Sequence, residues 1–375
     1  MKRLHLLLIA LLVLFMTVNC QPGEKQEDGL KDALADHFLM GVALNRWQVD
    51  QPDSSALAVV TKHFNSIVAE NCMKSEKIQP REGEFFFEDA DRFVEFGEQR
   101  DMQIVGHCLI WHSQAPRWFF TDDEGNEVSR EVLIDRMETH IKTLVGRYRG
   151  RIDGWDVVNE CFNDDGTLRN SRFLQIIGED YIRLAFEFAH AADPETELYL
   201  NDYNTMKPEK REAIYQLVKN LQAEGVRVDG IGMQGHLTMT FPEAEEMEKS
   251  IVKFAELGTV MITELDMTVL PWPSRDVSAD VSLNYAADPV YNPYPNGLTD
   301  SASVVWTERY MDFFNVFLKH SDKISRVTMW GLNDGQTWRN NWPIRGRSDY
   351  PVLFDRENQA KPVVNEIIKA AAASK

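Results

Sequence analysis

The sequence predicts an α/β protein built as a single (β/α)8 TIM barrel. Eight short apolar runs recur along the chain, amphipathic segments separate most of them, and polar or aromatic side chains stand at the ends of seven runs. Runs that are apolar throughout, rather than at every second residue, are typical of parallel strands buried on both faces. A chain of 375 residues is long enough for one such barrel with insertions.

The predicted strands and helices follow one another through most of the chain. The strands cover residues 38–44, 64–70, 103–111, 154–160, 197–202, 230–236, 260–266 and 326–332. Seven segments with apolar residues at three- and four-residue spacing predict helices. They cover residues 88–100, 130–149, 178–192, 208–225, 241–258, 303–322 and 361–374. Neither an internal repeat nor a second domain is evident in the sequence, so we expect one domain over residues 34–375.

The N-terminal segment has the pattern of an export signal. In residues 1–19 a basic pair precedes an apolar run that is too short to span a bilayer comfortably. Cys20 follows at the expected cleavage point, and the motif TVNC resembles the end of a bacterial lipoprotein signal, whose cysteine is lipidated. Residues 20–33 are polar and acidic, which predicts a flexible tether. We expect an exported lipoprotein, anchored to a bacterial membrane and compatible with surface display; the alternative is a secreted or periplasmic protein with an incidental cysteine.

Charge and cysteine content exclude some functions. The formal net charge of −19 argues against a nucleic-acid partner, because phosphate binding requires clustered Lys and Arg. After export three cysteines remain, Cys72, Cys108 and Cys161, without the C-x-x-C spacing of metal or redox sites. We expect them to be small buried hydrophobic residues rather than a disulfide framework.

Polar and aromatic side chains end seven of the eight predicted strands. In a (β/α)8 barrel these strand ends meet on one face, where the active site lies. The residues at or just past these ends are Glu70, Asn71, His107, Trp111, His112, Asn159, Glu160, Asn201, Asp202, Gln234, His236, Glu264, Asp266 and Trp330. A hydrated strand end would explain any one of them, but the whole set favours a shared cleft.

Glu160 and Glu264 are the best candidates for catalytic groups. Each ends an otherwise apolar run, where burying a charge for structure alone would be costly. Two carboxylates on well-separated strands are the minimum for hydrolysis of a glycosidic bond. A sugar-binding cleft also needs aromatic platforms and polar groups. Candidates for these are Trp111, Trp330, Trp338, Asn71, Lys74, His107, Gln114 and Gln234.

Other chemistries fit the sequence less well. A metal site could use His107, His112 and His236 with nearby acids, but no H-E-x-x-H or similar helical spacing is present. The sequence also has no G-x-S-x-G motif of a serine hydrolase and no Gly-rich phosphate-binding loop. We therefore expect neither a metal nor an organic cofactor.

Seven motifs, in order along the chain, resemble those of the family 10 glycoside hydrolases. They are AENCMKSEKIQP, GHCLIWHSQAPRW, WDVVNE, LNDYN, GIGMQGH, ITELD and MWGLNDGQTWR, which lie around predicted strands two to eight. The resemblance runs from about Phe38 to about Val364. It implies a (β/α)8 barrel and a retaining endo-β-1,4-xylanase that acts on xylan and xylo-oligosaccharides, and we expect a monomer.

The resemblance also implies roles for individual residues. Glu160 matches the general acid/base and Glu264 the nucleophile, while Asn159 matches the amide that holds the sugar 2-hydroxyl. His236 matches the imidazole that hydrogen-bonds the nucleophile, and Asp266 the group that orients it. Asn71, Lys74, His107, Gln114 and Gln234 match polar contacts to the glycone, and Trp111, Trp330 and Trp338 match the aromatic walls.

The implied mechanism is double displacement with a covalent glycosyl-enzyme intermediate, which requires carboxyl groups only about 5–5.5 Å apart. It predicts a raised pKa for Glu160, caused by ionised Glu264 close by. If Trp330 and Trp338 exclude a hydroxymethyl group, xylan should be hydrolysed faster than cellulose. Two alternatives remain: a retaining glycosidase for glucan or mannan, and a polysaccharide-binding lipoprotein without activity.

The sequence departs from the family pattern at three places. Cys72 stands where the family usually has an acid, and Ser75 where it usually has an aromatic residue, which would affect the rim of the cleft. The segment 271–303 is long and lacks helical periodicity. Its aromatic residues Trp272, Tyr285, Tyr291 and Tyr294 either bind leaving-group sugars or serve only to pack the loop.

Overall fold

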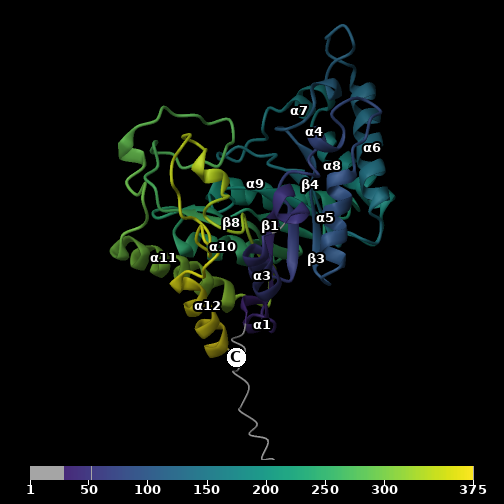
Figure 1. Cartoon of the computed structure of the whole chain (residues 1–375). Helices are drawn as coiled ribbons and strands as arrows, with labels where there is room; N and C mark the ends of the chain where they lie inside the picture. Colours follow the sequence, from purple (N-terminus) through teal and green to yellow (C-terminus); the bar gives the residue numbers. More distant parts are fainter. Residues whose placement is uncertain (1–28, 52, 375) are drawn as a thin grey trace, which may run out of the picture.

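The computed structural model describes residues 29–51 and 53–374, and within them a closed barrel of eight parallel strands forms the centre (Figure 1). The barrel strands are β1 (Leu39–Leu44), β2 (Ser66–Ala69), β3 (Gln103–Trp111), β4 (Gly154–Asn159), β5 (Glu197–Asp202), β6 (Gly230–Met233), β8 (Thr259–Thr268) and β9 (Ile324–Met329). Their order is β6-β5-β4-β3-β2-β1-β9-β8, and β6 pairs with β8 to close the barrel. A short strand, β7 (His236–Thr238), pairs with the end of β8. The predicted fold and all eight predicted strands are confirmed.

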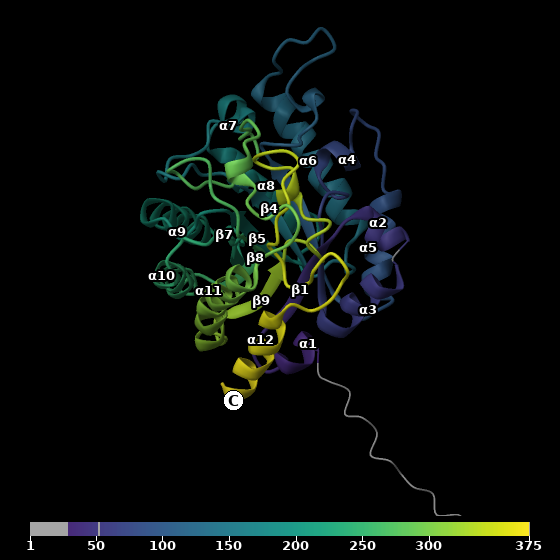
Figure 2. The same ribbon diagram turned by 60° about the vertical axis from the view of Figure 1, so that its left-hand side comes forward.

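Helices surround the barrel, as the two views in Figures 1 and 2 show. The longer ones are α3 (Ser54–His63), α5 (Glu88–Glu98), α6 (Arg130–Arg147), α8 (Asp180–Ala192), α9 (Pro208–Ala223), α10 (Ala244–Phe254), α11 (Asp300–Lys319) and α12 (Pro362–Ala373). Shorter elements are α1 (Leu30–Ala33), α2 (Arg46–Asp50), α4 (Ser75–Ile78), α7 (Arg172–Ile177), η1 (Arg117–Phe119), η2 (Pro289–Tyr291) and η3 (Trp338–Asn340). The seven predicted helices are confirmed, whereas α3 was not predicted. The carboxylate of Asp53 caps α3 by accepting from the backbone N–H of Ser55 at 2.7 Å.

The core lies between the barrel strands and the helices. Ile67 on β2, Phe93 on α5 and Ile141 on α6 are 1 % exposed or less, and burying each such side chain stabilises the fold by roughly 1.5–3 kcal/mol. Close packing is visible at Gly106 on β3, where an added Cβ would lie 2.1 Å from the ring of Trp155. These contacts fix the strand ends that carry the site.

Strand register places the predicted site residues side by side. Trp111 at the end of β3 is the register partner of Asn159 on β4, and Asn159 is the partner of Asn201 on β5. On the other side of the barrel, His236 on β7 is the partner of Asp266 on β8. Residues far apart in the sequence therefore meet at one end of the barrel.

The folded part of the chain begins earlier than residue 34. Leu30 on α1 is fully buried, and its backbone N–H donates to Nδ1 of His63 at 3.3 Å. Because α1 packs against α3 and α12, the last residues of the predicted tether belong to the domain. The predicted signal peptide, Cys20 and the rest of the tether lie outside the described residues. Among residues 29–51 and 53–374, no helix has the length and apolar character needed to cross a membrane.

Candidate active site

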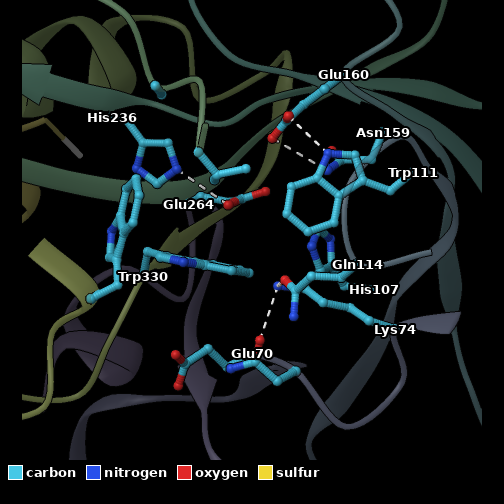
Figure 3. A pocket seen from close by; sticks show the side chains of 14 residues that line it. Glu70, Lys74, His107, Trp111, Gln114, Asn159, Glu160, His236, Glu264 and Trp330 are labelled. Atoms are coloured by element: carbon cyan, nitrogen blue, oxygen red, sulfur yellow. Dashed lines mark hydrogen bonds and ion pairs between the residues drawn. The ribbon is translucent and has the colours of Figure 1, made fainter. Parts of the chain in front are cut away.

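A cavity of about 220 Å³ opens where the carboxyl ends of the barrel strands meet (Figure 3). It is lined by Glu70, Asn71, Lys74, His107, Trp111, Gln114, Asn159, Glu160, His236, Glu264, Ala279, Val281, Trp330 and Trp338. The structure thus brings together both predicted catalytic residues and all but one of the predicted substrate-binding residues. Gln234 and the predicted orienting residue Asp266 lie behind this lining.

Glu160 follows β4 and is held by three hydrogen bonds. Its Oε2 accepts from the indole Nε1 of Trp111 at 2.8 Å, and its Oε1 accepts from Nε2 of Gln234 at 3.0 Å and Nδ2 of Asn159 at 3.4 Å. The backbone of Glu160 has φ 59°, a left-handed conformation that costs of order 1–3 kcal/mol for a residue with a side chain. Surrounding contacts therefore hold this carboxyl group in place.

Burial raises the pKa of Glu160 to about 7. The negative charge of Asp202 adds to this effect, and that of Glu264 contributes less, while the bonds from Gln234 and Trp111 oppose it. The predicted direction is confirmed, and the charge of Glu264 contributes as predicted, but it is a minor cause beside desolvation and Asp202. At neutral pH a large fraction of Glu160 carries a proton.

The pKa of Glu264 is shifted in the opposite direction from that of Glu160. Burial alone would raise its pKa, but the bond from His236, the charges nearby and the bond from Asn201 together hold the pKa below its usual value. Nε2 of His236 lies 3.3 Å from Oε2 of Glu264, and Nδ2 of Asn201 donates to Oε1 at 2.8 Å. The cavity therefore contains one carboxyl group that keeps its proton and one that loses it readily.

Asp266 orients the groups around Glu264. Its Oδ1 is 2.9 Å from Nδ1 of His236 and accepts from Nη2 of Arg339 at 2.7 Å, and its Oδ2 accepts from Nε1 of Trp338 at 2.7 Å. Burial opposes both shifts, yet these contacts lower the pKa of Asp266 to about 2 and raise that of His236 to about 9. His236 is thus a cation facing Glu264, and Asp266 fixes its ring.

Amide side chains connect the two glutamates. Asn201 donates from Nδ2 to Oδ1 of Asn159 at 2.9 Å as well as to Glu264. Gln234 is 1 % exposed and donates to Asn159 and Glu160, so the structure places it behind Glu160 rather than in the cavity wall. These bonds from Gln234 hold the carboxyl group of Glu160 in position.

A second group of polar residues lies away from Glu160 in the cavity, as Figure 3 shows for Glu70, Lys74 and Gln114. Nζ of Lys74 donates to Oδ1 of Asn71 and Oε1 of Gln114, both at 3.1 Å, and lies 4.8 Å from the centre of the Trp111 ring. These ammonium, amide and carboxylate groups are spaced to bind several hydroxyl groups.

The comparisons with known proteins identify the family. Residues 29–370 match the sequence profile described as glycosyl hydrolase family 10. The chain belongs to this family. It is 50% identical over 91% of its length, and 92% of the relative's, to endo-1,4-beta-xylanase A of Xylanibacter ruminicola. It is 38% identical to an endo-1,4-beta-xylanase of Geobacillus stearothermophilus, covering 90% of this chain and 97% of that one.

The solved structures agree with this family assignment. A novel GH10 endoxylanase retrieved from a sugarcane soil metagenome has a TM-score of 0.89 and 43% identity to the chain. The match covers 91% of this chain and 99% of that one. The predicted family resemblance is confirmed, and the protein is a glycoside hydrolase.

Two departures from the family pattern lie away from the cavity lining. Ser75 is buried at the start of α4 and donates its hydroxyl to the carbonyl oxygen of Leu109 at 3.2 Å, so it does not form the expected rim. Cys72 is a free cysteine, and burial raises its pKa to about 12. Cys108 and Cys161 are free and buried.

Several lining and supporting residues were not predicted as site residues. Glu70 lines the cavity, and burial raises its pKa; its position at the end of a predicted strand was the available signal. Arg339 is 1 % exposed and holds Asp266, but nothing in the sequence marks that contact. In the loop after β8, Ala279 and Val281 line the cavity, whereas its four candidate aromatic residues do not.

The three histidines considered for a metal site, His107, His112 and His236, each lie beside a carboxylate. In the part of the chain that the structure describes, no group of three or more His, Cys, Asp or Glu side chains could hold a metal ion. His107 instead pairs through Nδ1 with Oδ2 of Asp156 at 2.9 Å. Burial lowers the pKa of His112 to about 4, so it is neutral beside Glu160, with 3.9 Å between its Nδ1 and Oε2 of the carboxylate.

Proposed function

We propose that the protein is an endo-1,4-β-xylanase that hydrolyses internal bonds of xylan with retention of anomeric configuration. The observation that carries this proposal is the pair of buried carboxyl groups with opposite pKa shifts, Glu160 raised to about 7 and Glu264 lowered. Such a pair supplies an acid and a nucleophile at the same pH. The xylanases among the relatives support the choice of substrate.

The first step forms a glycosyl-enzyme ester. The ionised carboxylate of Glu264 attacks the anomeric carbon while protonated Glu160 gives its proton to the departing glycosidic oxygen. The bond between that oxygen and the anomeric carbon breaks, and the leaving chain departs with a new hydroxyl group. His236 and Asn201, which contact Glu264, keep the nucleophile ionised and oriented.

The second step releases the sugar. Glu160, now ionised, removes a proton from a water molecule, whose oxygen attacks the anomeric carbon as the ester bond to Glu264 breaks. The enzyme returns to its starting protonation state. Asn159 lies between the two carboxyl groups through its contacts with Glu160 and Asn201, where it would bind the 2-hydroxyl of the reacting sugar.

Substrate binding follows from the rest of the lining. Asn71, Lys74 and Gln114 form one hydrogen-bonded group that would hold glycone hydroxyls, and Trp111 offers an aromatic face nearby. Trp330 and Trp338 also line the cavity and would exclude the hydroxymethyl groups that distinguish glucan from xylan. A mannanase or glucanase is the competing assignment, which relative rates on the polymers would separate.

Retention can be tested directly by ¹H NMR of xylo-oligosaccharide hydrolysis. The first product signal should be that of the β-anomer, with the α-anomer appearing later by mutarotation. An α-anomer that appears first would contradict double displacement, and the absence of any product would contradict the activity. With 4-nitrophenyl xylobioside, whose leaving group departs without a proton from Glu160, the Glu160→Ala variant with added azide should give a β-glycosyl azide, since the small anion would enter the emptied space and attack the ester.

Lipid attachment at Cys20 is the second part of the proposal. A TVNC motif after an apolar run supports an exported and membrane-anchored protein. The full chain should partition into detergent phase and lose this property in the Cys20→Ser variant. Equal partitioning of both forms into the aqueous phase would favour a secreted or periplasmic enzyme instead.

A further inference from the structure

One guanidinium connects the long loop after β8 to the backbone of Glu160. Arg169, between β4 and α7, donates from Nε to the carbonyl oxygen of Glu160 at 3.0 Å and from Nη1 to Oδ2 of Asp280 at 2.8 Å. Its Nη2 donates to the phenolic oxygen of Tyr203, after β5, at 2.6 Å. A single side chain thus joins three segments that are remote in sequence.

Asp280 stands between the two loop residues that line the cavity. Ala279 and Val281 both contribute to the cavity wall, and Ala279 packs in a small apolar cluster with Tyr203 and Trp342. Oδ1 of Asp280 accepts from the backbone N–H of Ser282 at 2.9 Å, which leaves Oδ2 for Arg169. The ion pair between Arg169 and Asp280 therefore holds in place the two residues, Ala279 and Val281, that form this part of the cavity wall.

The pair is sheltered from solvent more than an ordinary surface ion pair. The side chain of Arg169 is 12 % exposed and that of Asp280 is 23 % exposed. Exposed pairs contribute little because water and salt screen them, whereas charge-assisted bonds in a partly buried setting are stronger and more directional. Other contacts of this part of the loop are the apolar packing of Ala279 and Leu283 and the bond from Nδ2 of Asn204 to the carbonyl oxygen of Val277 at 2.9 Å.

The same guanidinium holds Glu160 at its strained backbone. The N–H of Glu160 donates to the carbonyl oxygen of Asn201 at 2.9 Å, and its carbonyl oxygen accepts from Arg169. These two bonds fix the peptide groups on both sides of a residue with φ 59°. A change in the position of Arg169 would therefore alter the direction of the Glu160 side chain.

The loop that forms this wall is connected to Glu160 through Arg169. Figure 3 shows Glu160 at the top of the view and Glu70 at the bottom. Because an acid that protonates the departing oxygen faces the leaving group, sugars beyond the cleaved bond lie near Glu160 and near the loop that Arg169 attaches to it.

We propose that Arg169 is a positioning residue that couples the position of the loop segment 277–283 to the orientation of Glu160. With the loop held in this position, the cavity wall formed by Ala279 and Val281 recognises leaving-group sugars. This inference rests on the proposed xylanase function. It assigns substrate recognition to a loop whose four aromatic residues are not among those that line the cavity. One of them, Trp272, packs against Trp342 with ring centres 5.5 Å apart.

The test compares Asp280→Asn with Asp276→Asn, a matched charge removal at an exposed position of the same loop. Each variant is assayed on xylohexaose, which extends past the cleaved bond on both sides, and on 4-nitrophenyl xylobioside, whose leaving group is one aromatic ring. We expect Asp280→Asn to raise KM for xylohexaose about tenfold, as the loss of a charge-assisted bond implies. Its KM for the aryl glycoside and both KM values of Asp276→Asn should stay within about twofold of wild type.

Arg169→Lys completes the test because it keeps the charge but cannot reproduce all three bonds. We expect it to lower kcat on both substrates as well as to raise KM for xylohexaose, since Glu160 also loses a contact. An equal rise in KM for both substrates in Asp280→Asn would indicate a merely structural role and overturn the inference. So would wild-type values in Asp280→Asn, whereas a wild-type protein inactive on xylan would overturn the proposed function itself.

Discussion

Trp111 donates its indole N–H to Oε2 of Glu160 at 2.8 Å, from the end of one barrel strand to the end of the next. The bond is shielded, because Trp111 and Glu160 are 6 % and 4 % exposed. A hydrogen bond to the charged form of a carboxyl group lowers its pKa, so Trp111 opposes the effect of burial on Glu160. The aromatic wall of the cavity therefore also sets the proton affinity of the acid.

The Trp111→Phe variant should move the basic limb of the pH profile to higher pH. In wild type, kcat/KM should fall above about pH 7 as Glu160 loses its proton. Without the indole N–H the ionised form of Glu160 is less stable, so its pKa rises and the basic limb should move by about one pH unit. A shift of this size corresponds to the free energy of one hydrogen bond to a charged group. Trp330→Phe, which alters the lining without removing that bond, should change KM and leave the limb in place. A basic limb that stays in place in Trp111→Phe would contradict the assignment of Glu160 as the acid.

His236→Asn should move the acidic limb to higher pH. The imidazolium of His236 favours the ionised form of Glu264, so its removal raises the pKa of the nucleophile. Activity should then be lost at a higher pH as the solution is acidified, and kcat should fall at every pH. His112→Asn, beside Glu160 instead, should leave the acidic limb unchanged. A parallel shift in both variants would indicate a general electrostatic effect rather than the specific contact.

Asp266→Asn should destabilise the fold in a pH-dependent manner. The folded pKa of Asp266 is about 2, below its usual value of 3.8, so its contribution to stability is present above about pH 4 and is lost as the pH falls towards 2. The variant also leaves buried Arg339 without its charge partner, which costs about 3–5 kcal/mol. Denaturant midpoints at pH 7 and pH 3 should show a larger deficit at pH 7, and a deficit that is constant or grows in acid would contradict this reading.

Trp338→Ala should reduce discrimination between xylan and cellulose. The ring is held by its bond to Asp266 and by stacking on Trp342, with ring centres 4.3 Å apart. Its removal leaves room for a hydroxymethyl group, so the ratio of rates on xylan and cellulose should fall by about tenfold or more. Trp272→Ala, which removes a partner of Trp342 outside the lining, is the control and should keep the wild-type ratio. If the ratio of rates on xylan and cellulose is unchanged in Trp338→Ala, Trp338 does not determine this specificity.

The strands were predictable because burial on both faces leaves runs without polar interruptions. The helix α3 was not, since its sequence SSALAVVTKH contains β-branched residues with weak helix preference and is held by its cap and by packing. The start of the fold was missed for a related reason. Leu30 is the buried anchor of a short polar helix, and a single apolar residue does not distinguish a helix from a tether.

The site was predictable where side chains stand at the ends of predicted strands or within the motifs that resemble the family, as for Lys74, Gln114 and Trp338. Glu160, Glu264 and His236 stand at or near the ends of the predicted strands, and the folded barrel brings them together in one cavity. The bond between Arg169 and Asp280 joins residues 111 positions apart in irregular segments, where no periodicity indicates a contact. The cause of the Glu160 pKa shift was also beyond the sequence, because the depth of burial and the position of Asp202 depend on the packed structure.

The central claim is that Glu160 and Glu264 carry out the hydrolysis of xylan. Reducing-sugar release from xylan should therefore be measured for the wild-type protein and for Glu264→Ala, with circular dichroism to verify that both are folded. We expect activity in the wild type and a loss of about 10⁴-fold or more in the variant, the size of effect expected when a nucleophile is removed. A folded Glu264→Ala protein that retains wild-type activity would contradict the assignment of the nucleophile, and a wild-type protein inactive on xylan would contradict the proposed substrate.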